Sequence, residues 1–230
     1  MIFAGIAAGG IGSRMGFDIP KQFIKLKGKP IIIWTVEKFL ADSRIEKIYL
    51  GVHSERIGYT ESLVNEYIEQ KERICIIKGG KDRNSTVLRI IEKISEDYGI
   101  NPDNIILTHD AVRPFVTDKI INGNIQTALS GKPCTTAVKA TDTILYSENG
   151  TETEKTLDRN CLYHAQTPQS FNIKTFIDAY SRLTEKQKSS LTDACGVFNG
   201  AGIPVSIVEG DVSNIKITTP YDLKIAEALI

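Results

Sequence analysis

The sequence predicts an α/β fold with a largely parallel, doubly wound central sheet. Short apolar segments rich in β-branched residues alternate with segments of helical periodicity along almost the whole chain. Two of the apolar segments end in paired glycines followed by basic residues, a pattern typical of strands that lead into ligand-binding loops. At 230 residues the chain is long enough for one large core. We therefore expect a single domain over residues 1–230, with a ligand crevice at the carboxyl ends of its strands.

The first half of the chain predicts three strand–helix units. Residues 2–7 form an apolar run that indicates a buried strand, and the apolar positions between Pro30 and Leu40 recur at helical spacing. The following segments predict a strand, a helix, a strand and a helix, in that order. They are residues 45–52, 61–71, 74–77 and 87–94.

The second half adds further units and one hairpin. We expect strands at 105–108, 135–138, 205–208 and 214–218, and helices at 118–129, 173–182 and 221–229. Asn172 and Thr219 are suited to cap the helices at 173–182 and 221–229, and residues 192–194 begin or lie within another helix. Residues 158–160 and 167–169 are polar and are expected to form a loop that returns to the ligand-binding face. Residues 139–165 predict a projecting β-arm, a hairpin that turns at Asn149-Gly150. Because such a hairpin exposes its edges, we expect it to pair with a second copy in a homodimer.

Charge and cysteine content narrow the possible partners and location. Basic and acidic residues balance at 28 each, so no overall field attracts nucleic acid or an acidic membrane, and we expect neither as a partner. The first residues lack the pattern of a signal peptide, and no apolar run reaches membrane-spanning length. Four separated cysteines without a C-x-x-C pair indicate buried, reduced thiols. These features predict a cytoplasmic protein.

The loop after the first strand is a candidate triphosphate site. Its residues are Ala7, Ala8, Gly9, Gly10 and Gly12. Consecutive exposed N–H groups form a concave anion site, to which Arg14 and Lys21 add positive charge. The spacing fits neither G-x-G-x-x-G nor the P-loop pattern, and a purely structural turn is the alternative.

A second loop repeats this pattern after the third strand. Gly79 and Gly80 precede Asp82, Arg83, Ser85 and Thr86, which combine charge with small polar groups before a helix. Glycine would let backbone groups approach a nucleotide base. The alternative is a simple turn with a helix cap.

Polar residues also follow the fourth strand. Asp110 and Arg113 lie at the carboxyl end of this strand, where open α/β sheets bind ligands. Asp110 is a candidate Mg²⁺ ligand, and an ion pair with Arg113 that shapes the loop is the alternative. We expect His109 to be a hydrogen-bonded scaffold residue.

Together these blocks resemble the small sugar-alcohol phosphate cytidylyltransferases, which include the methylerythritol phosphate and ribitol phosphate enzymes. The resemblance runs nearly end to end. It rests on Ala8-Gly9-Gly10-Ile11-Gly12-Ser13-Arg14-Met15, Pro20-Lys21-Gln22, Gly79-Gly80 with Arg83, His109-Asp110-Ala111-Val112-Arg113-Pro114, Asp158-Arg159-Asn160, Gln166-Thr167-Pro168-Gln169 and Asn214-Ile215-Lys216.

The resemblance implies a Rossmann-like nucleotidyltransferase fold, CTP and a polyol phosphate as substrates, Mg²⁺ as the divalent cation, and a homodimer joined by the β-arm. It assigns catalytic roles to Arg14, Lys21 and Lys216. CTP would bind at Ala7, Ala8, Gly9, Gly10, Gly12, Gly79, Gly80, Asp82, Arg83, Ser85, Thr86 and Ala111. The acceptor would bind at Asp110, Arg113, Asp142, Thr143, Arg159, Thr167 and Thr192.

The finer match is to the ribitol 5-phosphate branch, so the sequence predicts CDP-ribitol as product. The glycine loop has an additional residue, Val112 stands where the methylerythritol enzymes carry a second Ala, and Tyr163 stands where they tend to carry Trp. The alternatives are 2-C-methyl-D-erythritol 4-phosphate as acceptor, and a non-catalytic nucleotide-binding module.

Overall fold

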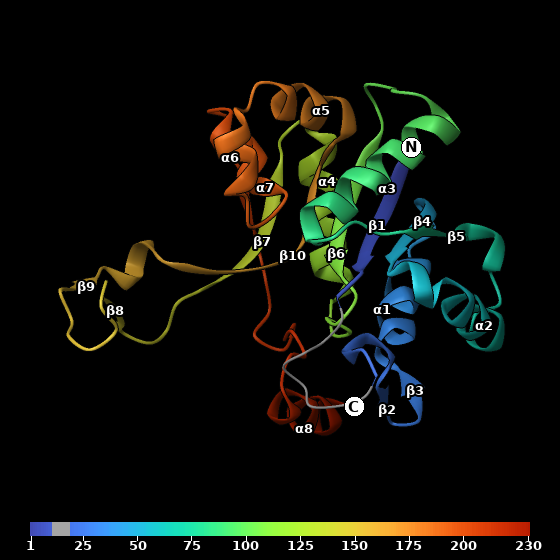
Figure 1. Ribbon diagram of the computed structural model, residues 1–230, viewed down its shortest axis with the longest axis horizontal. Helices are drawn as coiled ribbons and strands as arrows, with labels where there is room; N and C mark the ends of the chain where they lie inside the picture. Colours follow the sequence, from blue (N-terminus) through green and yellow to red (C-terminus); the bar gives the residue numbers. More distant parts are fainter. Residues whose placement is uncertain (11–18) are drawn as a thin grey trace.

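A seven-stranded sheet forms the centre of the computed structural model, which describes residues 1–10 and 19–230. The strand order is β11–β7–β10–β6–β1–β4–β5 (Figure 1). The strands are β1 (Ile2–Ala8), β4 (Ile45–Val52), β5 (Ile74–Lys78), β6 (Ile105–Asp110), β7 (Cys134–Lys139), β10 (Tyr163–Asn172) and β11 (Ser206–Glu209). Neighbouring strands are parallel except where β10 meets β6 and β7. The predicted largely parallel sheet is confirmed.

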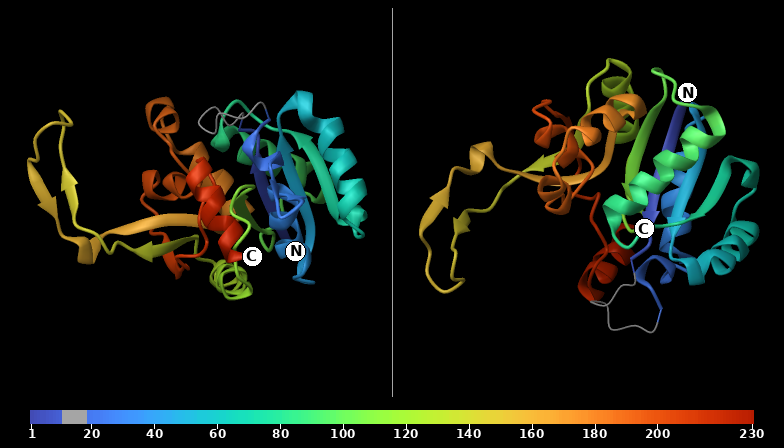
Figure 2. Two further views of the ribbon diagram at one scale, coloured as in Figure 1. Left: turned by 90° about the horizontal axis from the view of Figure 1, so that it is seen from below. Right: turned by 45° about the horizontal axis from the view of Figure 1, so that its top comes forward.

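Helices cover both faces of this sheet, as a doubly wound fold requires (Figure 2). On one face, α1 (Ile31–Leu40), α2 (Ile57–Tyr67) and α4 (Asp118–Leu129) contribute to one buried apolar cluster. On the other, α3 (Arg83–Tyr98), α5 (Ile173–Ser181) and α7 (Cys195–Gly200) contribute to a second cluster that contains Phe3 and Phe171. The short helix α6 (Glu185–Ser189) precedes α7.

A third, smaller cluster joins the C-terminal helix to the start of the chain. Helix α8 (Pro220–Leu229) packs on the two-stranded hairpin of β2 (Lys25–Leu26) and β3 (Lys29–Pro30). Val112 and Ile217 are both buried in this cluster. The packing holds the loop after β6 against the segment that leads into α8.

Side-chain caps explain where several helices begin. Asp82 caps α3, since its carboxylate accepts from Ser85 N at 2.7 Å while Ser85 Oγ accepts from Asp82 N at 3.0 Å. Asn172 caps α5 and Thr219 caps α8, both as predicted. Such caps stabilise a helix by about 1 kcal/mol each.

The predicted β-arm is confirmed. Strands β8 (Ile144–Tyr146) and β9 (Lys155–Leu157) form an antiparallel hairpin that projects far from the sheet (Figures 1 and 2). Gly150 has a positive φ of 74°, which favours glycine in the turn. The Asn149 side chain accepts from two backbone N–H groups there.

The prediction of loops around 158–160 and 167–169 was only partly right. Arg159–Cys161 is a short 3₁₀ turn, but residues 167–169 belong to the ten-residue strand β10 near the middle of the sheet. The strand is polar and contains Pro168, so no apolar alternation predicts it. Pro168 lacks an N–H and lies where the pairing with β7 is interrupted, between Ala165 and Gln169.

Further element predictions were wrong in detail, among them the helix predicted at 87–94, which spans Arg83–Tyr98. No strand forms at 214–218, where one backbone bond, Ile217 N to Val112 O at 2.9 Å, and the burial of Ile217 hold the segment instead. Helix α2 runs over Ile57–Tyr67, four residues earlier at both ends than the predicted 61–71, and it ends where Ile68 adopts an extended conformation.

The membrane and cysteine predictions can be compared with the described residues. Within residues 1–10 and 19–230, no helix combines the length and apolar character that a membrane crossing needs. All four cysteines are free, and Cys134 and Cys195 are buried. Cys161 on the arm is exposed, so the expectation of buried thiols was wrong there.

Candidate active site

A cleft lies at the carboxyl ends of β1, β5 and β6. Both glycine loops reach it, and so do cationic side chains from three separate parts of the chain: Lys21, Arg83 and Lys216. The described residues that line it are Ala7, Ala8, Gly9, Gly10, Lys21, Gln22, Gly80, Lys81, Asp82, Arg83, Thr86, Asp110, Ala111, Val112 and Lys216. The structure thus brings together most of the predicted CTP-binding residues. Gly12 and Arg14 lie outside the described residues.

The first glycine loop is fastened by Gln22, a residue that the sequence analysis did not assign to the site. Gln22 is buried, and its Nε2 donates to Ala8 O at 2.7 Å and to Gly10 O at 2.9 Å. Because Lys21 directly precedes Gln22, the same turn places an ammonium group and fixes the loop backbone. The position of Gln22 in the Pro20-Lys21-Gln22 block was the available signal.

The second glycine loop is held by its own side chains. Thr86 is buried, and its Oγ1 accepts from Gly80 N at 3.0 Å and donates to Asp82 O at 2.7 Å. Asp82 and Ser85 form the cap of α3, and Arg89 donates to Gly79 O at 2.6 Å. Asp82, Ser85 and Thr86 therefore shape this loop and the start of α3, which is the alternative to nucleotide binding that the sequence left open. Their contacts with a nucleotide stay a prediction.

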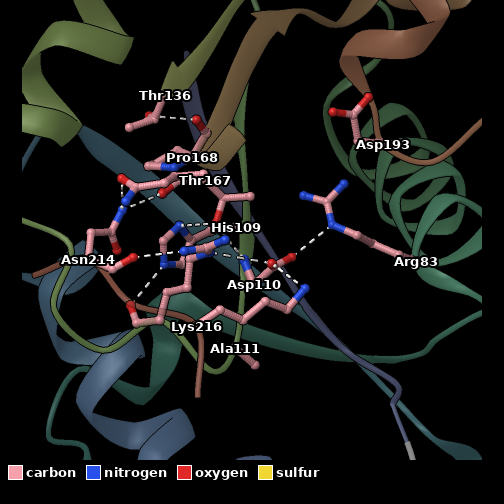
Figure 3. Close-up of polar contacts among 12 residues, drawn as sticks. Arg83, His109, Asp110, Ala111, Thr136, Thr167, Pro168, Asp193, Asn214 and Lys216 are labelled. Atoms are coloured by element: carbon pink, nitrogen blue, oxygen red, sulfur yellow. Dashed lines mark hydrogen bonds and ion pairs between the residues drawn. The ribbon is translucent and has the colours of Figure 1, made fainter. Parts of the chain in front are cut away.

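Asp110 is the centre of a charged cluster beneath the cleft (Figure 3). Its carboxylate lies 2.8 Å from Arg83 Nε, 2.9 Å from Lys216 Nζ and 3.6 Å from Arg113 Nε. Burial alone would raise the pKa of Asp110, but the charges of Arg83 and Lys216 outweigh it and hold this pKa well below its usual range. Asp110 is therefore an anion that orients three cations.

His109 is a scaffold residue, as predicted. It is fully buried, with Nε2 3.1 Å from Arg113 O and Nδ1 3.0 Å from Thr167 Oγ1. Because a carbonyl only accepts, Nε2 carries the proton and Nδ1 accepts from the Thr167 hydroxyl, whose oxygen accepts from Asp110 N at 3.2 Å. The chain of bonds fixes the backbone at Asp110. Thr167, a predicted acceptor-binding residue, is occupied in this chain of bonds.

Burial of His109 makes stability depend on pH. Desolvation lowers the pKa of His109 to about 4, so below its ordinary value of 6.5 the unfolded chain gains a proton that the folded chain does not. The free energy of unfolding should fall as the pH drops from about 6.5 to about 4, by up to about 1.4 kcal/mol per pH unit from this residue. Urea unfolding of wild type and His109→Gln at several pH values measures the difference in slope. Equal slopes for the two proteins in this interval would contradict the assignment.

The segment that carries Lys216 is held by side chains rather than by strand pairing. Asn214 is fully buried, and its Nδ2 donates to Thr167 O at 2.9 Å and to Gln166 Oε1 at 3.1 Å. Arg113 Nη1 donates to Asn214 O at 2.7 Å. The predicted lysine therefore reaches the cleft, although the strand predicted to carry it does not form.

The remaining acceptor residues are not brought to the cleft within one chain. Asp142, Thr143 and Arg159 are exposed at the base of the projecting arm, where Arg159 Nη1 donates to Thr141 O at 3.1 Å. Thr192 is exposed on the loop before α7. Their roles as acceptor ligands stay predictions.

The described residues do not provide a protein cage for a divalent cation. In residues 1–10 and 19–230, no three His, Cys, Asp or Glu side chains cluster as metal ligands. Asp110 already accepts from Arg83 and Lys216, which makes it a poor Mg²⁺ ligand in this arrangement. The geometry favours the alternative in which Asp110 is an ion-pair partner.

Comparison with known proteins gives a consistent match. The family model described as IspD, 2-C-methyl-D-erythritol 4-phosphate cytidylyltransferase, matches residues 2–230. The enzyme of that name from Francisella tularensis is 30% identical, with a TM-score of 0.80 over 100% of this chain and 99% of that one. The 4-diphosphocytidyl-2C-methyl-D-erythritol synthase from Anaerococcus prevotii is 27% identical, with a TM-score of 0.81 over 100% of this chain and 95% of that one.

A more distant structure agrees in fold. The 2-C-methyl-D-erythritol 4-phosphate cytidylyltransferase from Thermus thermophilus is 24% identical, with a TM-score of 0.76 over 100% of this chain and 98% of that one. The Rossmann-like nucleotidyltransferase fold is thereby confirmed. Because the family model spans almost the entire sequence, the chain belongs to the IspD family of cytidylyltransferases, which are nucleotidyltransferase enzymes.

Proposed function

We propose that the protein transfers a cytidylyl group from CTP to a polyol phosphate, with release of pyrophosphate. The observation that carries this proposal is the convergence of Lys21, Lys216 and Arg83 on one cleft lined by two glycine loops. Loop amides and cations suit a triphosphate. A non-catalytic nucleotide-binding module would need the loops but not cations from three separate segments.

The chemistry asks for charge neutralisation rather than proton transfer. An oxygen of the acceptor phosphate attacks the α-phosphorus of CTP in line, a new P–O bond forms, and the bond to pyrophosphate breaks. The attacking oxygen is already anionic, so positioning and stabilisation of the developing charge carry catalysis. We assign this stabilisation to Arg14, Lys21 and Lys216. Mg²⁺ would enter on the phosphates of CTP rather than on carboxylates of this chain.

For the acceptor, the family match supports 2-C-methyl-D-erythritol 4-phosphate over the ribitol 5-phosphate that the finer sequence features predicted. We therefore propose the methylerythritol compound first. Ribitol 5-phosphate is the second candidate, because Val112 packs in the buried cluster with Ile217, beside Lys216. Val112, which is larger than the Ala that the methylerythritol enzymes carry there, also lines the cleft.

One assay tests both the transfer of the cytidylyl group and the identity of the acceptor. Purified protein is incubated with CTP, Mg²⁺ and either acceptor, and pyrophosphate is measured. Turnover with methylerythritol phosphate is the expected result, and a competition between the two acceptors ranks them by kcat/KM. Preference for ribitol 5-phosphate would reverse the order of the acceptors. Absence of pyrophosphate with both acceptors would overturn cytidylyl transfer to these polyol phosphates.

We also propose that the β-arm completes the active site of a second copy in a homodimer. Asp142, Thr143 and Arg159 are exposed at the base of the arm, and the arm projects away from the central sheet of its own chain (Figure 1). An arm that reaches a second molecule would place these residues at that molecule's acceptor site.

Mixed dimers test this arrangement. When Arg159→Ala and Lys21→Ala subunits combine, one of the two sites has an intact Lys21 and an intact Arg159 from the other subunit. Purified heterodimers should recover about half of wild-type activity, although each parent homodimer is nearly inactive. Pyrophosphate release from differently tagged, tandem-purified heterodimers is the measurement. Confirmed heterodimers as inactive as the parents would mean that each chain supplies its own Arg159.

A further inference from the structure

Gln169 on β10 connects two sides of the cleft that are far apart in sequence. Its side chain is 1% exposed, and its Oε1 accepts from Arg83 Nη1 and from Ala194 N, each at 3.3 Å. Its Nε2 donates to Asp193 Oδ2 at 2.7 Å. One amide group thus joins the first turn of α3 to the loop that precedes α7.

The orientation of this amide is determined by its neighbours. A guanidinium and a backbone N–H only donate hydrogen bonds, whereas the Asp193 carboxylate only accepts them. The oxygen must therefore face Arg83 and Ala194, and the nitrogen must face Asp193. A side chain that both accepts and donates is required here, because Arg83 and Ala194 N donate to Gln169 while Asp193 accepts from it.

The loop before α7 is tied to α3 at a second point. Asn84 Nδ2 donates to Leu191 O at 2.8 Å, while Asp193 Oδ1 accepts from Gly196 N at 2.8 Å. Residues 191–194 are thus fastened at both ends, and the exposed Thr192 lies between them. Because both ends of this short loop are held, the position of Thr192 within it is restricted.

The Gln169 side chain also contacts the charged cluster around Asp110, because its oxygen accepts from Arg83. The Arg83 guanidinium bonds Asp110 through Nε and Gln169 through Nη1, while its Nη2 is enclosed and makes no hydrogen bond with the residues that the structure describes. Asp110 and Gln169 therefore determine the direction of Arg83.

We propose that Gln169 is a positioning residue for the acceptor. It holds the loop at residues 191–194, which carries the predicted acceptor residue Thr192, in register with the Arg83–Asp110 pair, so that the polyol phosphate meets a preformed surface. The identity of the acceptor rests on the proposed function, whereas the hydrogen-bonded connection does not. The backbone of the two glycine loops proposed to bind CTP is held by Gln22 and Thr86 rather than by Gln169. Arg83, the predicted CTP-binding residue that contacts Gln169, stays anchored to Asp110 through Nε.

Gln169→Glu tests the proposal with a change of almost no volume. The new carboxylate cannot donate and faces Asp193, which repels the loop. We expect the KM for the acceptor to rise about ten-fold or more with a lower kcat, and the KM for CTP to stay within about two-fold. Gln126→Glu, the same change at an exposed position of α4, is the matched control. An unchanged acceptor KM, or an equal rise in both KM values, would refute the proposal.

A second substitution supplies a rescue. In Gln169→Glu/Asp193→Asn, the asparagine amide donates to the new carboxylate while its oxygen still accepts from Gly196 N. The double variant should recover most of the lost acceptor affinity, although Asp193→Asn alone sets two donors against each other and should resemble Gln169→Glu. If Gln169→Glu fails to fold, Asp193→Asn still tests the pairing. A double variant no better than either single variant speaks against it.

Hydrogen exchange separates this proposal from the proposed function. Amides of residues 191–196 should exchange faster in Gln169→Glu than in wild type, while those of the β8–β9 arm stay unchanged. This measurement needs no substrate, so it tests the connection even if wild type releases no pyrophosphate with either acceptor. Unchanged exchange at 191–196 would overturn the positioning role.

Discussion

Lys21→Ala is expected to lower kcat for pyrophosphate release by about 10²–10³-fold, the range measured when one donor to a developing negative charge is removed. Lys21 lines the cleft beside Gly9 and Gly10, and Gln22 fastens the same turn to the loop backbone. An ammonium held in this way needs little reorganisation as charge builds on the phosphates. The barrier should therefore rise without loss of the fold.

Steady-state kinetics and circular dichroism on matched variants measure this effect. Lys25→Ala removes the same charge four residues later, at an exposed position of β2, and should leave kcat nearly unchanged. Lys21→Arg keeps the charge but alters its geometry, so an intermediate kcat is expected. Near-normal turnover of a folded Lys21→Ala protein would remove Lys21 from the catalytic machinery.

Asp110→Asn is expected to lower the free energy of unfolding by about 3–5 kcal/mol, the usual result of leaving buried charges without their partner. Arg83, Arg113 and Lys216 all lie around this one carboxylate, which is 6% exposed. An amide keeps the shape but leaves three cations to repel one another. The loss should be accompanied by weaker acceptor binding, since Arg83 and Lys216 lose their common anchor.

Urea unfolding at pH 7 measures this loss, and a double-mutant cycle isolates its cause. Arg83→Met should cost less stability in the Asp110→Asn background than in wild type, with a coupling of about 0.5–3 kcal/mol. Asp178→Asn is the matched control on α5, where the carboxylate pairs with Lys174 at the surface, and it should change stability by no more than about 0.5 kcal/mol. Equal losses for the two Asp→Asn variants would contradict the central role of Asp110.

Local sequence patterns predicted the helices and strands in which buried apolar residues recur at a regular spacing. The apolar runs of β1, β4 and β6 and the periodic apolar positions of α4 were located correctly because one chemical pattern repeats over many residues. Strand β10 was missed because its polar side chains are buried and satisfied by partners distant in sequence. Thr167, for instance, bonds His109 fifty-eight residues away. No local pattern contains such a partner.

The residues of the candidate site also fall into two groups, those that local sequence patterns predicted and those whose contacts only the structure shows. The sequence alone predicted a ligand site near Gly9, Gly79 and Asp110, because glycine loops and charged residues directly follow apolar strands there. Only the tertiary structure decided that Arg83, Arg113 and Lys216 share Asp110, and that Gln169 joins α3 to the loop at Asp193. The physical reason is that hydrogen bonds and ion pairs depend on distances between atoms, and packing of the sheet sets those distances between segments far apart in the chain.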